Sequence, residues 1–560
     1  MTNREVAAVL DNIADILQMK NDNPFKVRAY RKAAGTVYHL EVDLNILHRQ
    51  QRLGEIPGVG TGVKGIIEEL LTTEECHYYS ELLAEYPPGV FDLLALPGIG
   101  HATVKIIYDQ LGIDNLHDLL QAALDKKIRA LPGLGAKTEY TIKKGIEMLQ
   151  KNAGKSTLGL ALPMAELFRE YLQSLDGVEM AAVTGSIRRC KPLVSDIDLL
   201  IAARDFEATR ERARNYRYIK TVKLEENDHL QGLLDYNLEF EVILVKPEDF
   251  YPRLVWTTGS KAHRQVLAQA FGFDPDHHPA LHSEAEVYQN MNLPFIPPEL
   301  RENTGEVEAA TQNSLPVLVE VKDIQGDLHV HSDWSDGACK IVDIANHARK
   351  LGYSYIAITD HSQSLSISGG LNRERLQAQA RVIDELNASC KDFRILKGIE
   401  VDILRDGSLD FEDDILKELD IIVASIHSHF KLNRDEQTAR IIRAMENKYV
   451  NIIGHLTGRL LNRRSGYEVD VEKILAAAAQ NNVALEINSH PDRLDVDENI
   501  VRRACACGVK LAINSDAHDL NELANVSYGA AVARRGWAQK SDVLNTMDLK
   551  NFTQNLSNRR

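Results

Sequence analysis

The chain has 560 residues and a formal net charge of −16, because 81 acidic residues outnumber 65 lysines and arginines. With 44% hydrophobic and 26% charged residues, the composition is that of a folded protein of about three or four domains and excludes disordered, fibrous and membrane-spanning classes. The acidic balance also excludes a protein that coats nucleic acid by bulk charge. The six cysteines form no CxxC pair and the N-terminus lacks a signal or transit peptide layout, so we expect a cytoplasmic protein without a disulfide framework.

Residues 1–150 predict an all-helical region that carries three similar turns. Three segments share the pattern apolar-Pro-Gly-apolar-Gly, each before a helical run: 56–60, 96–100 and 131–135. One such turn alone is usually only a turn, but glycines here also let backbone N–H groups approach a phosphate without reading base sequence. Three copies favour DNA binding. The candidate contacts are Gly58, Gly60, Gly98, Gly100, Gly133 and Gly135.

Residues 151–310 predict a domain that mixes helices with strands. Strand-like runs occur at 179–184, 196–203 and 238–245. The turn between the first two runs begins with Gly-Ser, ten residues before an Asp-x-Asp sequence. We therefore expect an α+β domain whose polar groups gather at one end of its sheet.

The Asp-x-Asp sequence indicates a divalent-metal site. Asp196 and Asp198 project from the same face of a strand, and a third acid would come from a neighbouring strand, where Glu239 and Glu241 share one face. Such close carboxylates are costly unless cations neutralise them, and two Mg²⁺ (or Mn²⁺) ions shared with substrate phosphates are the usual solution. An Asp-x-Asp at a solvated strand end is the alternative, which the preceding Gly-Ser disfavours.

After an expected linker at 311–323, residues 324–560 predict a regular βα domain. Six or seven strands alternating with helices imply a parallel sheet, closed or nearly closed as a distorted (β/α) barrel. The predicted strands include 355–359, 393–398, 421–425, 452–453, 484–487 and 510–514.

Histidines and acids cluster at the carboxyl ends of these strands, where barrel active sites lie. Any one of these histidines is more often a hydrogen-bonded core residue, but nine strand-end positions together favour a metal centre. Imidazoles and carboxylates without thiolates suit two or three Mn²⁺, Zn²⁺ or Fe ions. Arg459 and Arg493, near these motifs, either touch a phosphate or form salt bridges. The candidate ligands are His329, His331, Asp336, His361, Glu400, His427, His455, Asp516 and His518.

These motifs, in this order, resemble those of the family X DNA polymerases of bacteria and archaea, the PolX family. The N-terminal turns resemble helix-hairpin-helix motifs, Gly185-Ser with Asp196-x-Asp198 and Thr258–Lys261 resembles the polymerase palm and thumb, and the C-terminal motifs resemble a PHP phosphoesterase domain. The resemblance implies gap-filling DNA repair with dNTPs on gapped or nicked DNA, 3′-5′ exonuclease activity in the PHP domain, and a monomer. It also implies triphosphate contacts by Gly185, Ser186, Arg189 and Gly259.

The sequence departs from the family pattern around the expected nucleotide pocket. Glu241 replaces the usual aspartate, Trp256-Thr257 replaces an aromatic pair, and Arg264 and Ala268 replace an asparagine and an arginine. Three hypotheses follow: a bifunctional polymerase and exonuclease, a polymerase-impaired nuclease that uses the palm only to position DNA, and a non-enzymatic DNA-end-binding module. The nine filled ligand positions contradict the third.

Overall fold

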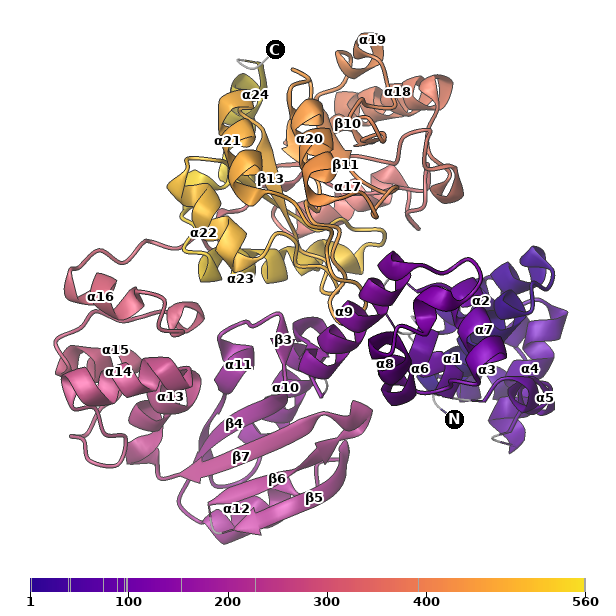
Figure 1. The fold of residues 1–560 in the computed structure, drawn as a ribbon. Helices are drawn as coiled ribbons and strands as arrows, with labels where there is room; N and C mark the ends of the chain where they lie inside the picture. Colours follow the sequence, from indigo (N-terminus) through magenta and orange to yellow (C-terminus); the bar gives the residue numbers. More distant parts are fainter. Residues whose placement is uncertain are drawn as a thin grey trace. The chain divides into compact units, whose positions relative to one another are not determined.

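The computed structural model describes residues 1–557, apart from positions 2, 39, 41, 74, 88, 95, 97, 98, 153, 227 and 391. The chain forms two compact units, residues 1–153 with 463–465 and residues 154–462 with 466–560 (Figure 1). Among the described residues, no helix has both the length and the apolar composition that a membrane span requires.

The first unit is all helical in its described part, as predicted. Helix α1 buries one face of apolar residues, including Val6, Leu10, Ile13 and Leu17, against the neighbouring helices. This three-and-four spacing is what places them on one stripe. The elements are α1 Asn3–Met19, α2 Pro24–Tyr38, α3 Leu44–Arg49, η1 Leu53–Glu55, α4 Thr61–Thr73, α5 His77–Glu85, α6 Gly89–Leu94, α7 His101–Leu111, α8 Leu116–Leu124, η2 Ile128–Ala130 and α9 Ala136–Asn152.

The second unit begins with a five-stranded sheet in the order β2-β4-β7-β6-β5. Strands β4 and β7 run parallel and the other neighbours pair antiparallel, so the starts of β4 and β7 lie side by side. The elements are β1 Ser156–Thr157, α10 Leu158–Gln173, β2 Val178–Val183, α11 Gly185–Arg188, β3 Leu193–Val194, β4 Asp196–Ala203, α12 Phe206–Ala213, β5 Ile219–Glu226, β6 His229–Leu234, η3 Asp235–Asn237 and β7 Glu239–Val245.

A helical subdomain follows the sheet and has its own apolar core. Val255, Leu267, Tyr288 and Leu300 are buried together there. The elements are η4 Pro247–Asp249, α13 Phe250–Thr258, α14 Lys261–Phe271, α15 Glu284–Asn290, η5 Pro298–Leu300 and α16 Glu306–Thr311.

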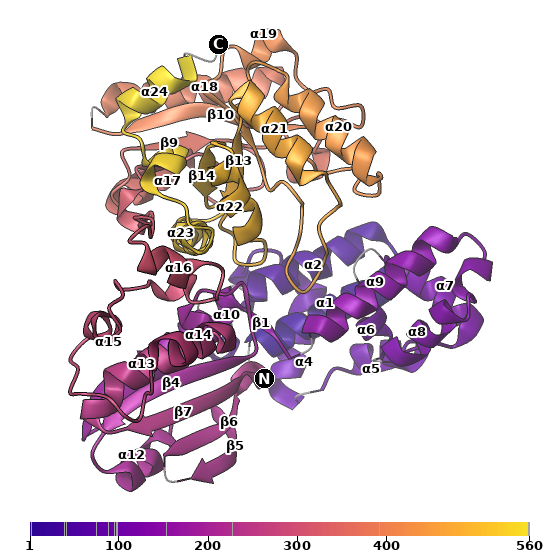
Figure 2. The same cartoon turned by 60° about the vertical axis from the view of Figure 1, so that its left-hand side comes forward.

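The C-terminal part is the predicted barrel. Seven parallel strands follow one another in the order β14-β13-β12-β11-β10-β9-β8, and a parallel bridge between Val330 and Ala517 joins the two edges. Figure 2 shows the helices on the outside of these strands. The elements are η6 Val321–Asp323, β8 Gly326–Asp327, α17 Ile341–Lys350, β9 Tyr355–Ile358, η7 Ser366–Ser368, α18 Arg373–Ser389, β10 Arg394–Asp402, α19 Asp413–Leu416, β11 Ile421–Ser425, α20 Arg434–Met445, β12 Ile452–Ile453, α21 Val471–Asn481, β13 Ala484–Asn488, α22 Glu498–Ala506, β14 Leu511–Asn514, η8 Asn521–Asn525, α23 Val526–Arg535, η9 Lys540–Asp542, η10 Leu544–Thr546 and α24 Leu549–Ser557.

Most of the predicted strands lie within one or two residues of their expected bounds, and β10 is the exception; β5, β6 and β8 were not predicted. The sequence predicts its end at Gly398, but the strand continues to Asp402. Glu400 and Asp402 interrupt the apolar pattern, although both are buried in the strand. Glu400 lies among His361, His427 and His455, and Asp402 pairs with His427.

Candidate functional site

The carboxyl ends of the barrel strands bring the nine candidate ligands together. His329 follows β8, His361 follows β9, Glu400 lies on β10, His427 follows β11 and His455 follows β12. Asp516 and His518 follow β14, which closes the circle beside β8. Because parallel strands point their carboxyl ends the same way, residues far apart in sequence meet at one mouth.

The ligand atoms form three overlapping groups in which all atoms lie within 4.8 Å of one another. Glu400 lies at the centre of the histidines, since its Oε1 is 3.1 Å from His455 Nε2 and 3.3 Å from His427 Nε2. The three groups are His331–Asp336–His361–His518, His329–His331–Asp516 and His361–Glu400–His427. Each group is a candidate metal-binding set.

Unsatisfied polar atoms show that the donor set fits metal ions. Within the part of the chain that the structure describes, His329 Nε2, His331 Nδ1 and His455 Nδ1 are buried and make no hydrogen bond, while His361 Nδ1 and Glu400 Oε2 face each other at 2.7 Å. Buried nitrogen and oxygen atoms are normally paired, so this concentration of exceptions at one place points to ions as their partners. The set of imidazoles and carboxylates suits Mn²⁺, Zn²⁺ or Fe.

A second set of carboxylates orients the histidines, and the sequence analysis missed it. Glu486 Oε1 lies 2.7 Å from His329 Nδ1, and Asp402 Oδ1 lies 2.6 Å from His427 Nδ1. His518 Nδ1 donates to the main-chain carbonyl of Asp516 at 2.8 Å, which leaves its Nε2 for a metal. Such bonds fix the tautomer and raise ligand basicity. The sequence signal for Glu486 was an acid inside an apolar strand.

Electrostatics within the cluster are strongly perturbed. Burial disfavours the charged form of His361, yet Glu400 and Asp336 outweigh it and raise its pKa to about 10. Burial, with His518 and His361 as neighbours, lowers the pKa of His331 to about 3. The buried carboxylates thus favour positive charge among the histidines, and bound metal cations would supply such charge.

The two arginines near the centre differ in what they contact. Arg459 Nε donates to the main-chain carbonyl of Arg493 at 2.9 Å, and its Nη2 donates to that of Leu494. Arg493 instead places Nε 3.8 Å from Oδ2 of the candidate ligand Asp516. Arg459 thus supports the loop, and Arg493 lies beside the metal-binding groups.

In the five-stranded sheet, the predicted acidic triad comes together at the starts of β4 and β7. The parallel register places Asp198 directly opposite Glu241, while Asp196 lies two residues earlier on the same face. Burial and the neighbouring carboxylates of Asp196 and Glu241 raise the pKa of Asp198 to about 7. Gln231 donates to Glu241, which holds the longer acid in place. Bound cations would keep Asp198 ionised at neutral pH.

The position of the Asp198 side chain requires a glycine at residue 185. Its φ of 58° lies in the left-handed region, and a Cβ there would stand 1.7 Å from Asp198 Oδ2. The N–H of Thr184 also donates to the Asp198 carbonyl at 2.8 Å. The turn and β4 therefore lie so close together that only glycine fits at residue 185.

The residues expected to contact a triphosphate differ in whether their polar groups already have hydrogen-bond partners. Ser186 Oγ is buried without a partner among the described residues, as expected of a hydroxyl that awaits a ligand. Gly259 lies close to α14, since a Cβ there would meet His263 at 2.9 Å. Arg189 is buried and donates to the Thr258 carbonyl at 2.8 Å and to Glu302 Oε1 at 2.9 Å. Contact between Arg189 and a triphosphate stays a prediction, which would require leaving these partners.

Three of the residues that depart from the family pattern, Trp256, Thr257 and Arg264, line one hollow. The Arg264 guanidinium is 5.4 Å from the centroid of the Trp256 ring, and both line a hollow of about 340 Å³ with Lys246 and Arg253. Asp228 and Asp249 also line this hollow, and Arg253 pairs with Asp276, so its lining mixes both signs of charge around the Trp256 indole.

The helix-hairpin-helix glycines keep open space where a backbone phosphate would approach. At Gly60, Gly100, Gly133 and Gly135 an added Cβ would meet nothing within 4 Å, although at Gly58 it would meet Lys32 at 2.9 Å. Gly60, Gly100 and Gly135 immediately precede α4, α7 and α9, whose first N–H groups are available for an anion. Gly98 lies outside the described residues. DNA contact by these turns stays a prediction.

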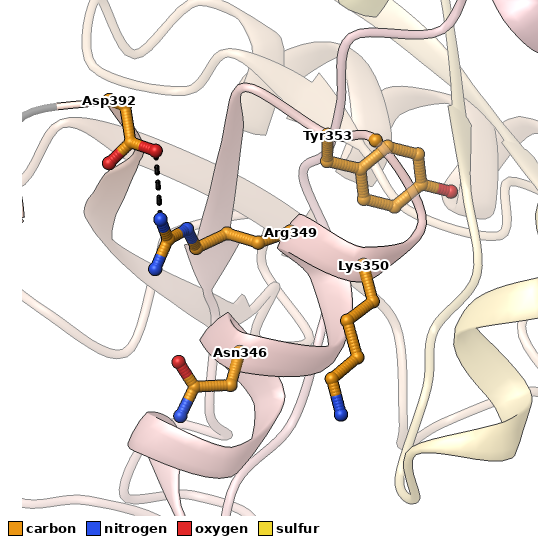
Figure 3. A pocket seen from close by; sticks show the side chains of 6 residues that line it. Asn346, Arg349, Lys350, Tyr353 and Asp392 are labelled. Carbon is orange, nitrogen blue, oxygen red and sulfur yellow. Dashed lines mark hydrogen bonds and ion pairs between the residues drawn. The ribbon is translucent and has the colours of Figure 1, made fainter.

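One hollow of about 600 Å³ is separate from this chemistry (Figure 3). It lies between the end of α17 and the segments that lead into β9 and β10, at the opposite end of these strands from the ligands. Arg349 and Asp392 pair across it at 2.8 Å. It therefore contributes nothing to the metal centre.

Comparisons with known proteins agree with this division. Family models described as "Helix-hairpin-helix domain", "SAM-like Helix-hairpin-helix tandem" and "PHP domain" match residues 1–76, 90–147 and 327–490. The chain is 33% identical over 231 residues to a probable phosphatase of Thermoanaerobacter sp. (strain X514), which covers 39% of this chain and 89% of that relative. It is 38% identical over 565 residues to the "DNA polymerase/3'-5' exonuclease PolX" of Bacillus subtilis (strain 168), which covers 98% of both chains. With the helical region, the acidic triad and the barrel centre in the expected order, the chain belongs to the PolX family.

Proposed function

We propose that the chain is a DNA repair enzyme that fills short gaps with its palm and trims 3′ ends with its PHP domain. It is thus a DNA-directed DNA polymerase and a metal-dependent 3′-5′ exonuclease. The proposal rests on one observation. The chain, which is similar to PolX along nearly its whole length, contains both the acidic triad of the palm and the histidine and carboxylate cluster of the barrel. The proposed substrates are gapped or nicked DNA and dNTPs, handled by a monomer in the cytoplasm.

In the PHP domain, the nine strand-end residues would hold two or three Mn²⁺, Zn²⁺ or Fe ions. When bound, such ions supply hydroxide near neutral pH and neutralise charge on the attacked phosphodiester. Glu486 and Asp402 hold His329 and His427 in the orientation that presents Nε2 to the centre. Arg493 binds a non-bridging phosphate oxygen beside Asp516. Its guanidinium lies next to the candidate ligand Asp516 and is partly exposed, so a phosphate can reach it.

In the palm, Asp196, Asp198 and Glu241 would hold two Mg²⁺ or Mn²⁺ ions. When bound, these ions supply charge neutralisation at the attacking and leaving oxygens of an in-line phosphoryl transfer. The unpaired Ser186 hydroxyl donates to a triphosphate oxygen, and Gly185 keeps that turn against Asp198. The three N-terminal turns bind the DNA backbone on either side of the gap through main-chain N–H groups.

A nuclease with an inactive palm is the alternative, and the geometry disfavours it. Asp198 lies opposite Glu241 in register, and the clash-limited Gly185 still abuts Asp198. Burying carboxylates close together is energetically unfavourable. A palm kept only to position DNA would not need this arrangement.

Two substitutions test the assignment of each activity to its site. Asp198→Asn should abolish primer extension and leave exonuclease activity unchanged, whereas Glu400→Gln should do the reverse. Glu412→Gln, an exposed glutamate on the barrel, serves as the matched control and should change neither. Exonuclease activity that survives Glu400→Gln would contradict the PHP assignment, and extension that survives Asp198→Asn would contradict the palm assignment.

A further inference from the structure

The last residue of α23, Arg535, is buried where the barrel packs against the palm within the second unit. Its side chain is 5% exposed and faces two carboxylates and one main-chain carbonyl. Nη1 donates to Glu302 Oε1 at 3.1 Å and to the Arg189 carbonyl at 2.6 Å, while Nη2 donates to Glu498 Oε1 at 2.9 Å. Its two terminal nitrogens are therefore paired, as a buried guanidinium requires, while Nε has no hydrogen-bond partner among the described residues.

These bonds connect Arg535 to the turn that carries the expected triphosphate contacts. The Arg189 carbonyl lies at the end of α11, Gly185–Arg188, where helix carbonyls lack partners within the helix. Glu302 Oε1 accepts from both Arg535 and Arg189, and Arg189 in turn donates to Thr258. One arginine of the barrel thus closes a buried network of alternating charges around this turn.

The backbone directly after Arg189 adopts a conformation that needs support from other segments of the protein. Cys190, directly after Arg189, has a φ of 54°, in a region that non-glycine residues rarely adopt. Such a conformation persists when surrounding bonds over-determine it. The Cys190 N–H bonds to the Ile187 carbonyl and the Lys191 N–H to the Ser186 carbonyl, and Arg535 bonds to the Arg189 carbonyl, in the peptide that precedes Cys190.

Neighbouring Arg534 shows by contrast what is specific to Arg535. Arg534 also joins the barrel to the preceding segment, through a bidentate pair with Glu299 and a bond to the Val319 carbonyl. None of these partners belongs to the turn. Removing Arg534 therefore weakens the same junction without releasing the Arg189 carbonyl.

We propose that Arg535 of the PHP domain is a positioning residue for the polymerase site, which holds the Gly185–Arg189 turn in shape through the Arg189 carbonyl and Glu302. The barrel thereby completes the triphosphate turn of the palm. This inference rests on the proposed polymerase function for its catalytic consequence, while its structural part stands independently.

Hydrogen–deuterium exchange in the full-length protein tests the structural part without any activity. In Arg535→Met, amides of the segment 186–191 should exchange about tenfold faster, because a local opening becomes easier when the clamp is lost. Strands β4 and β7 should keep their wild-type exchange. Arg534→Met is the matched control and should leave segment 186–191 unchanged. Glu302→Gln, which keeps the shape but removes the shared charge, should reproduce the local effect.

Primer extension tests the consequence in the same proteins. Arg535→Met should raise the KM for dNTP about tenfold with a smaller change in kcat, because a misplaced turn weakens triphosphate binding. Its exonuclease activity should be unchanged. Equal exchange of segment 186–191 in wild type and both Arg535→Met and Glu302→Gln would overturn the inference. So would exchange that rises equally across β4 and β7, which would mean general destabilisation. A wild type that never extends a primer would refute the polymerase proposal, while the exchange result would still decide the role of Arg535.

Discussion

Replacement of Gly185 by alanine should separate the two activities. The new Cβ would stand 1.7 Å from Asp198 Oδ2, where ordinary contacts begin near 3.4 Å. The Asp198 carboxylate must therefore move by roughly 1.5 Å, and displacements of about 1 Å in a preorganised site cost about 100-fold in rate. That loss corresponds to about 2.7 kcal/mol in activation free energy.

The matched control is Gly177→Ala, in the turn before β2. Gly177 has a φ of 86°, so alanine there carries a similar left-handed backbone cost, on the order of 1 kcal/mol, but its Cβ meets nothing within 4 Å. Single-turnover primer extension and exonuclease activity would be measured for both variants. Gly185→Ala should lose at least about 100-fold in extension and keep its nuclease, and Gly177→Ala should keep both. Extension by Gly185→Ala within tenfold of wild type would refute the reasoning.

Three further predictions concern the metal centre, its phosphate contact and the helical subdomain. Glu486→Gln should weaken metal binding about 10- to 100-fold in titration calorimetry, because His329 loses its orienting carboxylate, and unchanged affinity would contradict this role. Arg493→Ala should raise the KM for DNA in the exonuclease reaction, whereas Arg459→Ala should mainly lower the melting temperature; the reverse pattern would mean that the two roles are exchanged. Burial opposes the charge on Glu284, but Arg301 and Arg188 outweigh it and hold its pKa below the ordinary 4.5. Its stabilisation is therefore complete above pH 4.5 and is lost as the pH falls through the lowered pKa. The melting temperatures of wild type and Glu284→Gln should differ at pH 7 and converge as the pH falls below 4.5, and a constant difference would argue against this linkage.

Much of the architecture could be predicted because local patterns carry it. Apolar spacing of three and four predicted the helical first unit, and short apolar runs predicted the barrel strands to within a few residues. The position of the His and Asp motifs at strand ends was then enough to predict that they meet at one end of the barrel, since all strands of a parallel barrel point the same way. Strand β10 was the exception, because Glu400 and Asp402 are buried charges whose partners come from other strands.

The remainder depends on contacts between residues far apart in sequence. Glu486 and Asp402 read as ordinary strand acids until the fold places them against His329 and His427. Arg189 matched the family motif for a triphosphate contact, yet its guanidinium bonds to Glu302. Its carbonyl accepts a bond from Arg535, which lies 346 positions later in the chain. No periodicity in the sequence reports such a pairing, because each partner looks like a solvated surface charge.

The central claim, that one chain both extends and shortens a DNA 3′ end, is tested most directly with a 5′-labelled primer in a short gapped duplex. The purified protein would be incubated with Mn²⁺, with and without dNTPs. The account predicts shortening without dNTPs and lengthening to fill the gap when they are present. Shortening under both conditions would contradict the claim and leave the PHP centre as the only working site.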